Sequence, residues 1–196
     1  STGWVVGGIP TPILTPLVAK TTDGGLTWIN QTPAGIPGPI ITVDFVDQNI
    51  GYMSGQNMYK TTNGGTNWTQ VSLPGLSGTI NSLKAFDANN IYISTSTAEF
   101  YKTTNGGINW SNTNLNQIAW VSDIYFLNSE TGWAAGSNIA KTTNGGNTWT
   151  QYNLSLPYGE FYKIFFTSDQ IGWAIHYVYI YKTTNGGLNW SQIYSN

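Results

Sequence analysis

The side chains that could do chemistry in this sequence are few. There are nine acidic residues, seven lysines and one histidine, and neither cysteine nor arginine occurs. Glycoside hydrolysis needs two carboxylates that face each other across the substrate, and Asp123 is the best single candidate, followed by Glu160. His176 has no Asp or Cys beside it, which gives little support for acid–base catalysis. We therefore predict no catalytic residues, with a glycoside hydrolase or lyase as the alternative.

A nine-residue motif that occurs five times offers five polar loops. In Lys60–Trp68 it reads Lys-Thr-Thr-Asn-Gly-Gly-Thr-Asn-Trp, and the lysine, both threonines, both glycines and the tryptophan are kept in every copy. A calcium loop needs several oxygen ligands, usually with carboxylates, and only the first copy has a carboxylate, Asp23. We therefore predict no metal site and no cofactor. The other copies are Lys20–Trp28, Lys102–Trp110, Lys141–Trp149 and Lys182–Trp190.

Each motif is predicted to form a β-hairpin. The glycines allow positive φ, and the preceding Asn or Asp can hydrogen-bond its own backbone across the turn. The two threonines suit the entering strand, and the tryptophan is expected on the returning strand, buried between sheets. Successive motif lysines lie 40, 42, 39 and 41 residues apart, and such a period indicates a repeat architecture.

The motif Thr-x-Asn/Asp-Gly-Gly-x-x-Trp resembles the Asp-box, or bacterial neuraminidase repeat. Its fuller form is similar to repeats of the photosystem II stability/assembly-factor-like proteins, and the resemblance covers the whole chain. It implies a β-propeller in which the box is a folding element at the outer hairpin of each blade. Sialidases, the best-known Asp-box enzymes, use three arginines to hold the substrate carboxylate, so the lack of arginine excludes that activity. The assembly factors, a further functional alternative, also use an arginine-rich patch, which this chain lacks.

We predict an all-β fold, a propeller of five four-stranded blades in a single domain, residues 1–196. A full repeat has four strands, A to D: an apolar strand ending in Phe, the Gly-Trp strand, the strand entering Lys-Thr-Thr, and the strand carrying the boxed Trp. The first repeat begins at its strand B, so its blade lacks the innermost strand and the prediction is 19 strands. The repeat units are residues 1–31, 39–72, 79–112, 119–152 and 160–196.

The missing first strand leaves three alternatives. The ring tolerates the gap, the chain is part of a larger ring, or further repeats or a neighbouring chain complete the first blade. Strand B of the first repeat, Gly3–Gly7, is expected to pair with the strand entering Lys20 and to have a free edge on its other side. The Pro-rich insertion Gly7–Pro12 is expected to cover that edge. We predict a closed or nearly closed ring of five blades.

The B–C and D–A connections are the candidate binding surface. In an up-and-down blade they lie on the same face, and they vary between the repeats, as binding loops on a rigid scaffold do. Trp120 lies at the start of a strand A, where it can stack on a sugar or anchor a protein, or else pack against a neighbouring loop. His176 is expected to be a surface residue of the last B–C turn, beside Tyr177. Tyr158 lies in the last D–A connection.

The innermost strands carry a second group of candidates. Alignment of the repeats places four polar residues at one position of strand A: Thr42, Ser82, Asp123 and Lys163. Asp123 and Lys163 belong to adjacent repeats and can pair with each other. The alternative is that these residues only solvate the mouth of the central channel and bind nothing.

The composition limits the possible partners. Only 8% of the residues are charged and the net charge is −2, and five of the seven lysines lie in the motif. Without a basic cluster, nucleic acid is not an expected partner, and no apolar run is long enough to span a bilayer. Richness in Asn, Thr, Ser, Gly, Trp and Tyr suggests a bacterial extracellular, cell-surface or periplasmic protein. We predict a non-catalytic binding scaffold that presents its loop face to a protein or glycan.

Overall fold

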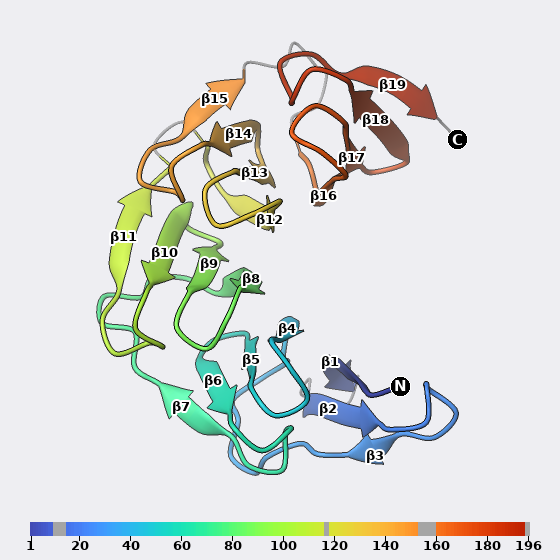
Figure 1. Ribbon diagram of the computed structural model, residues 1–196, viewed down its shortest axis with the longest axis vertical. Helices are drawn as coiled ribbons and strands as arrows, with labels where there is room; N and C mark the ends of the chain where they lie inside the picture. Colours follow the sequence, from blue (N-terminus) through green and yellow to red (C-terminus); the bar gives the residue numbers. More distant parts are fainter. Residues whose placement is uncertain (10–14, 116–117, 153–159, 195–196) are drawn as a thin grey trace. The chain divides into compact units, whose positions relative to one another are not determined.

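The computed structural model describes residues 1–9, 15–115, 118–152 and 160–194. The regular structure in these residues is all β-strand, as the sequence predicted (Figure 1). None of the described segments is a helix of the length and apolar character needed to cross a membrane.

Five antiparallel sheets hold the 19 strands, and neighbours in each sheet follow one another in the chain. The first sheet has three strands, which are β1 (Gly3–Ile9), β2 (Thr15–Thr21) and β3 (Ile29–Asn30). The second has β4 (Thr42–Phe45), β5 (Gly51–Ser54), β6 (Met58–Thr61) and β7 (Thr69–Val71). The third has β8 (Ile80–Ala85), β9 (Ile91–Thr95), β10 (Glu99–Thr103) and β11 (Ser111–Asn114). The fourth has β12 (Val121–Phe126), β13 (Gly132–Gly136), β14 (Ile139–Thr142) and β15 (Thr150–Tyr152). The fifth has β16 (Lys163–Phe166), β17 (Gly172–His176), β18 (Tyr179–Thr183) and β19 (Ser191–Tyr194).

These sheets are the predicted propeller blades, with strands A to D in order and strand A absent from the first. The chain divides into two compact units, one made of Ser1–Ile91 with Thr103–Trp110 and the other of Tyr92–Lys102 with Ser111–Asn196. Each unit is described by itself below.

The box turn is a closed hydrogen-bond network around one buried threonine. The Thr61 hydroxyl donates to Asn63 Oδ1 (3.0 Å) and accepts from the backbone N–H of Gly65 (2.9 Å). Asn63 Oδ1 also accepts from the backbone N–H of Asn67 (2.9 Å). Gly64 and Gly65 take φ values of 66° and 88°, which a side chain disfavours. The same bonds recur in the other four boxes. The Asn of four boxes therefore accepts the same hydrogen bonds as Asp23 does in the first.

The prediction that the boxed tryptophans are strand residues buried between sheets is wrong. Each lies one residue before the last strand of its sheet, so it ends the turn. Trp68 is half-buried, and its ring and that of Phe45 of its own first strand are nearly perpendicular (centroids 5.9 Å apart). Trp28 is 45% exposed, because the first sheet has no strand A and therefore no such phenylalanine. Trp110, Trp149 and Trp190 are also half-buried.

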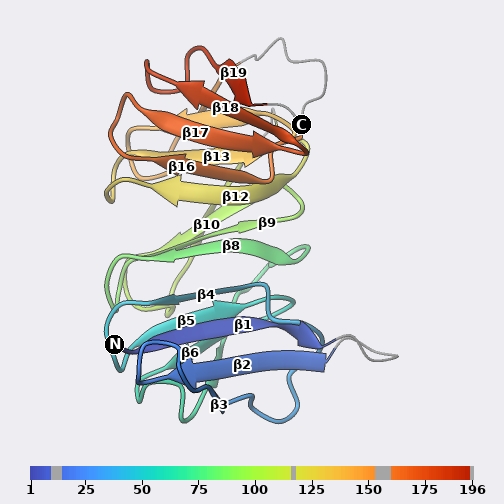
Figure 2. The same ribbon diagram turned by 90° about the vertical axis from the view of Figure 1, so that its right-hand side faces the viewer.

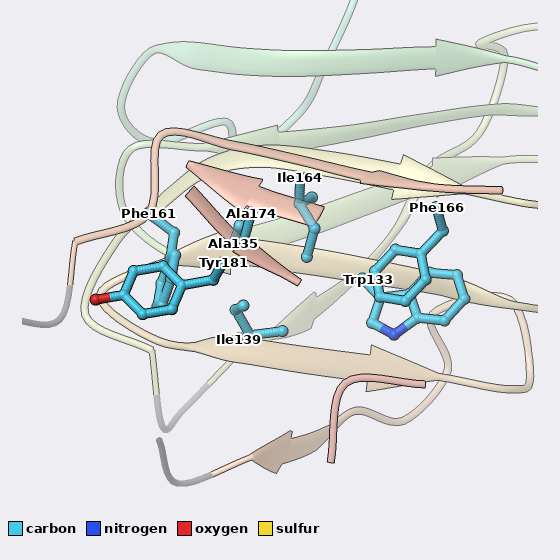
Figure 3. Close-up of a cluster of buried hydrophobic side chains, with 8 residues drawn as sticks. All are labelled: Trp133, Ala135, Ile139, Phe161, Ile164, Phe166, Ala174 and Tyr181. Atoms are coloured by element: carbon cyan, nitrogen blue, oxygen red, sulfur yellow. The ribbon is translucent and has the colours of Figure 1, made fainter. Parts of the chain in front are cut away.

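The aromatic residue of strand B joins its sheet to the next one. The Trp133 ring lies 3.5 Å from Phe166, nearly parallel to it, and its Nε1 donates to the Gly186 carbonyl (2.9 Å). Figure 3 shows these two rings face to face at one end of the core cluster. In the first unit, Trp4 stacks on Phe45 at the same distance of 3.5 Å.

The glycine of the Gly-Trp pair makes room for the phenylalanine of its own strand A. A Cβ on Gly132 would lie 2.4 Å from the Phe126 ring, and one on Gly172 would lie 2.5 Å from Phe166. The third repeat has Ile91 where the others have glycine, and there the phenylalanine position holds Ala85. Both are buried. In this sheet the larger side chain therefore lies on strand B and the smaller one on strand A.

The first hairpin is longer than the sequence suggested. β1 pairs with β2 as expected, but the pairing continues from Gly3 with Thr21 to Ile9 with Thr15. The residues Gly7–Ile9 of the insertion are therefore strand and do not cover an edge. The remainder of the insertion, residues 10–12, lies outside the described residues.

Candidate functional site

Asp123 and Lys163 form the pair that the repeat alignment predicted. Asp123 pairs with Ala135 and Lys163 with Ile175, which is the same register in two sheets. Their first strands, β12 and β16, lie side by side (Figure 2). Lys163 Nζ lies 3.2 Å from Asp123 Oδ1, and Asp123 Oδ2 accepts from the backbone N–H of Ile164 (3.1 Å). The nearly buried Asp123 thus joins two sheets, and the lysine neutralises it.

The first unit contains a second pair of this kind, which the sequence analysis missed. Lys84 Nζ lies 2.8 Å from Asp44 Oδ2, and the same oxygen accepts from the backbone N–H of Ala85 (2.9 Å). Asp44 and Lys84 are 40 residues apart, as are Asp123 and Lys163. An aspartate followed by a lysine 40 residues later is therefore the sequence pattern that could have predicted both ion pairs.

His176 is not the surface turn residue that was expected. It is the last residue of β17 and pairs with Tyr179, so the turn holds only Tyr177 and Val178. Side chains alternate along a strand, so His176 faces the core beside Ala174 and is 2% exposed. Its ring packs near Phe161 and stacks on Tyr179, each with centroids 5.9 Å away. It therefore offers no ligand contact at the surface.

Tyr177 is an exposed candidate with an unusual backbone conformation. It takes φ 46° and is 59% exposed, although positive φ is rare for bulky residues and costs about 1–3 kcal/mol. Its hydroxyl donates to Glu160 Oε2 (2.8 Å), and Tyr162 donates to the same oxygen (3.3 Å). The two rings meet edge to face at 5.2 Å. Hydrogen bonding with Tyr162 and then Glu160 raises the pKa of Tyr177 above its usual range.

Trp120 lies directly before strand A, β12, as predicted, and is 37% exposed. The B–C turn of the same sheet holds the backbone of Trp120, because the Trp120 carbonyl accepts a hydrogen bond from the Ser137 N–H (3.2 Å). A Cβ on Gly136 would lie 1.9 Å from that carbonyl, so only glycine fits there. The Gly136 carbonyl in turn accepts from Phe161 N–H (2.8 Å), which links Trp120 through the turn to the segment that carries Glu160.

Glu160, Tyr162 and Tyr177 therefore contact one another on the loop face of the second unit, and backbone hydrogen bonds link their segment to Trp120. We name these four residues the aromatic patch. Tyr158, the remaining sequence candidate, lies outside the described residues. Tyr162 and the bonds of Glu160 were not foreseen, because they depend on how the D–A connection meets the B–C turn.

The first unit has a hollow on its own B–C/D–A face, with a volume of about 390 Å³. Gln56 and Asn57 line it from the B–C turn, and Ser72, Leu73 and Leu76 from the D–A connection. The predicted loop face is thus concave and polar in this unit.

The motif lysines serve the joints between sheets. Lys20 Nζ lies over the Trp4 ring, 5.0 Å from its centroid, and donates to the Gly64 carbonyl of the next box (3.0 Å). Lys102 likewise donates to the Gly145 carbonyl (3.1 Å). Lys60, Lys141 and Lys182 lie over Tyr52, Trp133 and Trp173. The ammonium groups of all five motif lysines therefore make contacts within the fold. In the part of the chain that the structure describes, no three His, Cys, Asp or Glu residues gather into a metal-binding group.

The model of one protein family matches the whole chain. The family is described as photosynthesis system II assembly factor YCF48, and the matched residues are 1–119 and 108–196. The chain belongs to this family. No curated protein matches it.

Several solved structures are also similar to this chain. A structure of YCF48 bound to a D1 peptide is 25% identical with a TM-score of 0.75, and the match covers 97% of this chain. The chain spans only 62% of the length of that relative. YCF48 from Cyanidioschyzon merolae is 19% identical with a TM-score of 0.61, covering 96% of this chain and 87% of its own. A streptogramin B lyase, 14% identical with a TM-score of 0.74, covers 99% of this chain and 73% of its own. At such low identities, the lyase and the Cyanidioschyzon merolae structure show only that the fold is shared.

Proposed function

We propose that this protein is a non-catalytic binding propeller that holds a polypeptide segment on the B–C/D–A face of its second unit. The observation that carries the proposal is Tyr177, an exposed residue with a strained backbone whose hydroxyl is held by Glu160. Backbone strain of this kind is found most often at ligand contacts and active sites. A side chain that is already ordered loses less entropy on binding, so it contributes more of its contact energy to affinity.

The composition of the aromatic patch also favours a protein partner. Trp and Tyr are the residues that most often dominate the energy of protein interfaces. Glu160 gives the patch a negative charge, whereas the nearby Lys163 is paired with Asp123. We therefore propose a segment with an apolar or aromatic residue next to a basic one. The relative solved with a D1 peptide supports a polypeptide as the ligand class.

The non-catalytic part of the proposal rests on the engagement of the acidic residues. Asp123 holds Lys163 and a backbone N–H, and Glu160 accepts from two tyrosines. These contacts suit structural and binding roles. An extracellular or cell-surface location rests on composition alone and stays a prediction.

A displayed library of random peptides, selected on the immobilised protein, tests the proposal. The selected peptide should bind the Tyr177→Gly and Trp120→Ala variants about thirtyfold more weakly, the effect of losing one interface hot spot. Glycine keeps the positive φ and removes only the ring. Tyr194→Ala, a change at an exposed tyrosine of β19, is the control and should bind normally. Failure to select any peptide, or equal binding by all three variants, would overturn the proposal.

A further inference from the structure

A second, separate hollow lies in the first unit and has a volume of about 500 Å³. One wall is β3 and the connection that follows it, and the other is the box turn of the second sheet. Both walls belong to the same compact unit. The volume is in the range of small-molecule sites, about 300–1,000 Å³.

The walls of this hollow combine an aromatic ring with uncharged polar groups. Asn30, Gln31 and Asn67 provide carboxamides, Thr66 a hydroxyl, and Trp68 an indole. No charged residue is among the described residues that line it. A carboxamide both donates and accepts hydrogen bonds, whereas a charged ligand would lose its hydration without gaining an opposite charge.

Gln31 differs from the residues that hold the same position in two other repeats. In those repeats, the third residue after the boxed tryptophan lies against the second glycine of the next box. Val71 does so at Gly107, and Tyr152 does so at Gly187. At Gly65 this position is held by the carboxamide oxygen of Gln31.

The polar replacement leaves an unmet hydrogen-bonding capacity. Gln31 Oε1 is buried and has no hydrogen-bond partner among the described residues, which costs free energy that an apolar residue would avoid. A local choice that lowers stability is expected at functional sites. Rotation about the terminal bond of Gln is soft, so a ligand donor that enters the hollow can be met by this oxygen.

The indole N–H of Trp68 also lacks a hydrogen-bond partner among the described residues. Trp28, Trp110 and Trp190 each donate their Nε1–H to the carbonyl of the second glycine in their own box. Trp68 Nε1 has no such partner among the described residues, a property it shares with Trp149. The edge of the Trp68 ring packs on Phe45, and the half-buried ring also lines the hollow.

We propose that this hollow binds a neutral carbohydrate. The C–H face of a pyranose ring packs on Trp68, and its hydroxyls exchange hydrogen bonds with the carboxamides of Gln31 and Asn67. This ligand class uses both the apolar and the polar walls, and it needs no charge. The site is in a different unit from the aromatic patch and shares no residue with it, so the two proposals stand or fall separately.

The test measures binding of cellohexaose, xylohexaose, mannohexaose and chitohexaose to the purified protein by calorimetry and by saturation-transfer NMR. At least one of these sugars should bind. Asn67→Ala and Gln31→Val should each weaken that binding by about tenfold, the effect of losing one hydrogen bond. Asn189→Ala, at the same box position of the fifth sheet, is the matched control and should bind as the unchanged protein does.

Gln31→Val also gives a readout that misfolding cannot imitate. It places at this position the valine that the second repeat has there, Val71, so the melting temperature should stay the same or rise while sugar binding falls. Peptide binding at the aromatic patch should not change. If none of the four sugars binds, or if a sugar binds Gln31→Val and Asn67→Ala as tightly as the unchanged protein, the proposal is wrong.

Discussion

The Asp44 carboxylate and the Lys84 ammonium lie 2.8 Å apart, although the two residues are one full repeat apart in the chain. The same carboxylate accepts the backbone N–H of Ala85, on the strand that carries the lysine. Asp123 makes the equivalent pair of contacts with Lys163 and Ile164. Each aspartate therefore ties the first strands of two adjacent sheets together through one charged and one backbone partner.

The backbone contact should matter more than the ion pair. The Lys163 side chain is 65% exposed and that of Asp123 only 10%, so solvent screens the charge interaction. Asp123→Ala leaves a backbone N–H and a lysine without their acceptor, and should lower the free energy of unfolding by about 1–3 kcal/mol. Lys163→Ala should lower it by less than about 1 kcal/mol. Equal losses in urea denaturation would contradict this order.

The two threonines of the motif should differ sharply in importance. Thr61 is 1% exposed and its hydroxyl accepts the backbone N–H of Gly65, whereas Thr62 is exposed. Thr61→Val keeps the shape and removes the hydroxyl, so it should destabilise the protein by about 1–3 kcal/mol. Thr62→Val is the matched control and should change stability by about 0.5 kcal/mol or less. Similar melting temperatures for the two variants would show that the buried network is unimportant.

The tryptophans should fall into two classes. Trp133 is fully buried, stacks on Phe166 and donates to Gly186, so Trp133→Ala should cost about 3–5 kcal/mol. Trp28 is 45% exposed, so Trp28→Ala should cost about 1 kcal/mol, in the range of ordinary substitutions. Chemical denaturation of both variants measures the difference. A loss at Trp28 as large as that at Trp133 would mean that another part of the molecule covers the ring.

The fold could be predicted from the sequence because one short motif fixes the period, the turn and the strand order. The positive-φ glycines and the hydrogen bonds between Thr and the following Asn or Asp are local, so they recur in every copy. The ion pair of Asp123 with Lys163 could also be predicted from the repeat, because equivalent residues occupy the same register position in adjacent sheets. Whether the ring closes stays a prediction.

The individual positions that break the repeat could not be predicted. His176 was placed in the last B–C turn, but that turn has only two residues, and His176 is the last residue of β17. The exposure of Trp28 depends on a phenylalanine that its own sheet lacks. Tyr177 is held by Glu160, a contact between two connections whose shape no periodicity describes.

The first box should make the protein sensitive to acid in a way that the other four do not. Bonds from the hydroxyl and backbone N–H of Thr27, and then from Thr21, hold the pKa of Asp23 below its ordinary 3.8. Because the folded pKa is depressed, this contribution is present above pH 3.8 and is lost as the pH falls towards the folded value.

Asp23→Asn recreates the fourth box, where Asn144 keeps the same turn and donates to Thr148, but it cannot titrate. The melting temperature of the unchanged protein should exceed that of Asp23→Asn by a constant margin from about pH 5 to pH 7, and the margin should shrink steadily below pH 3.8. Asp47 and Asp87, whose pKa values are also lowered by turn hydrogen bonds, are common to both proteins, so their titration cancels in the difference. A margin that stays constant down to about pH 2 would show that the Asp23 carboxylate is not held by these bonds.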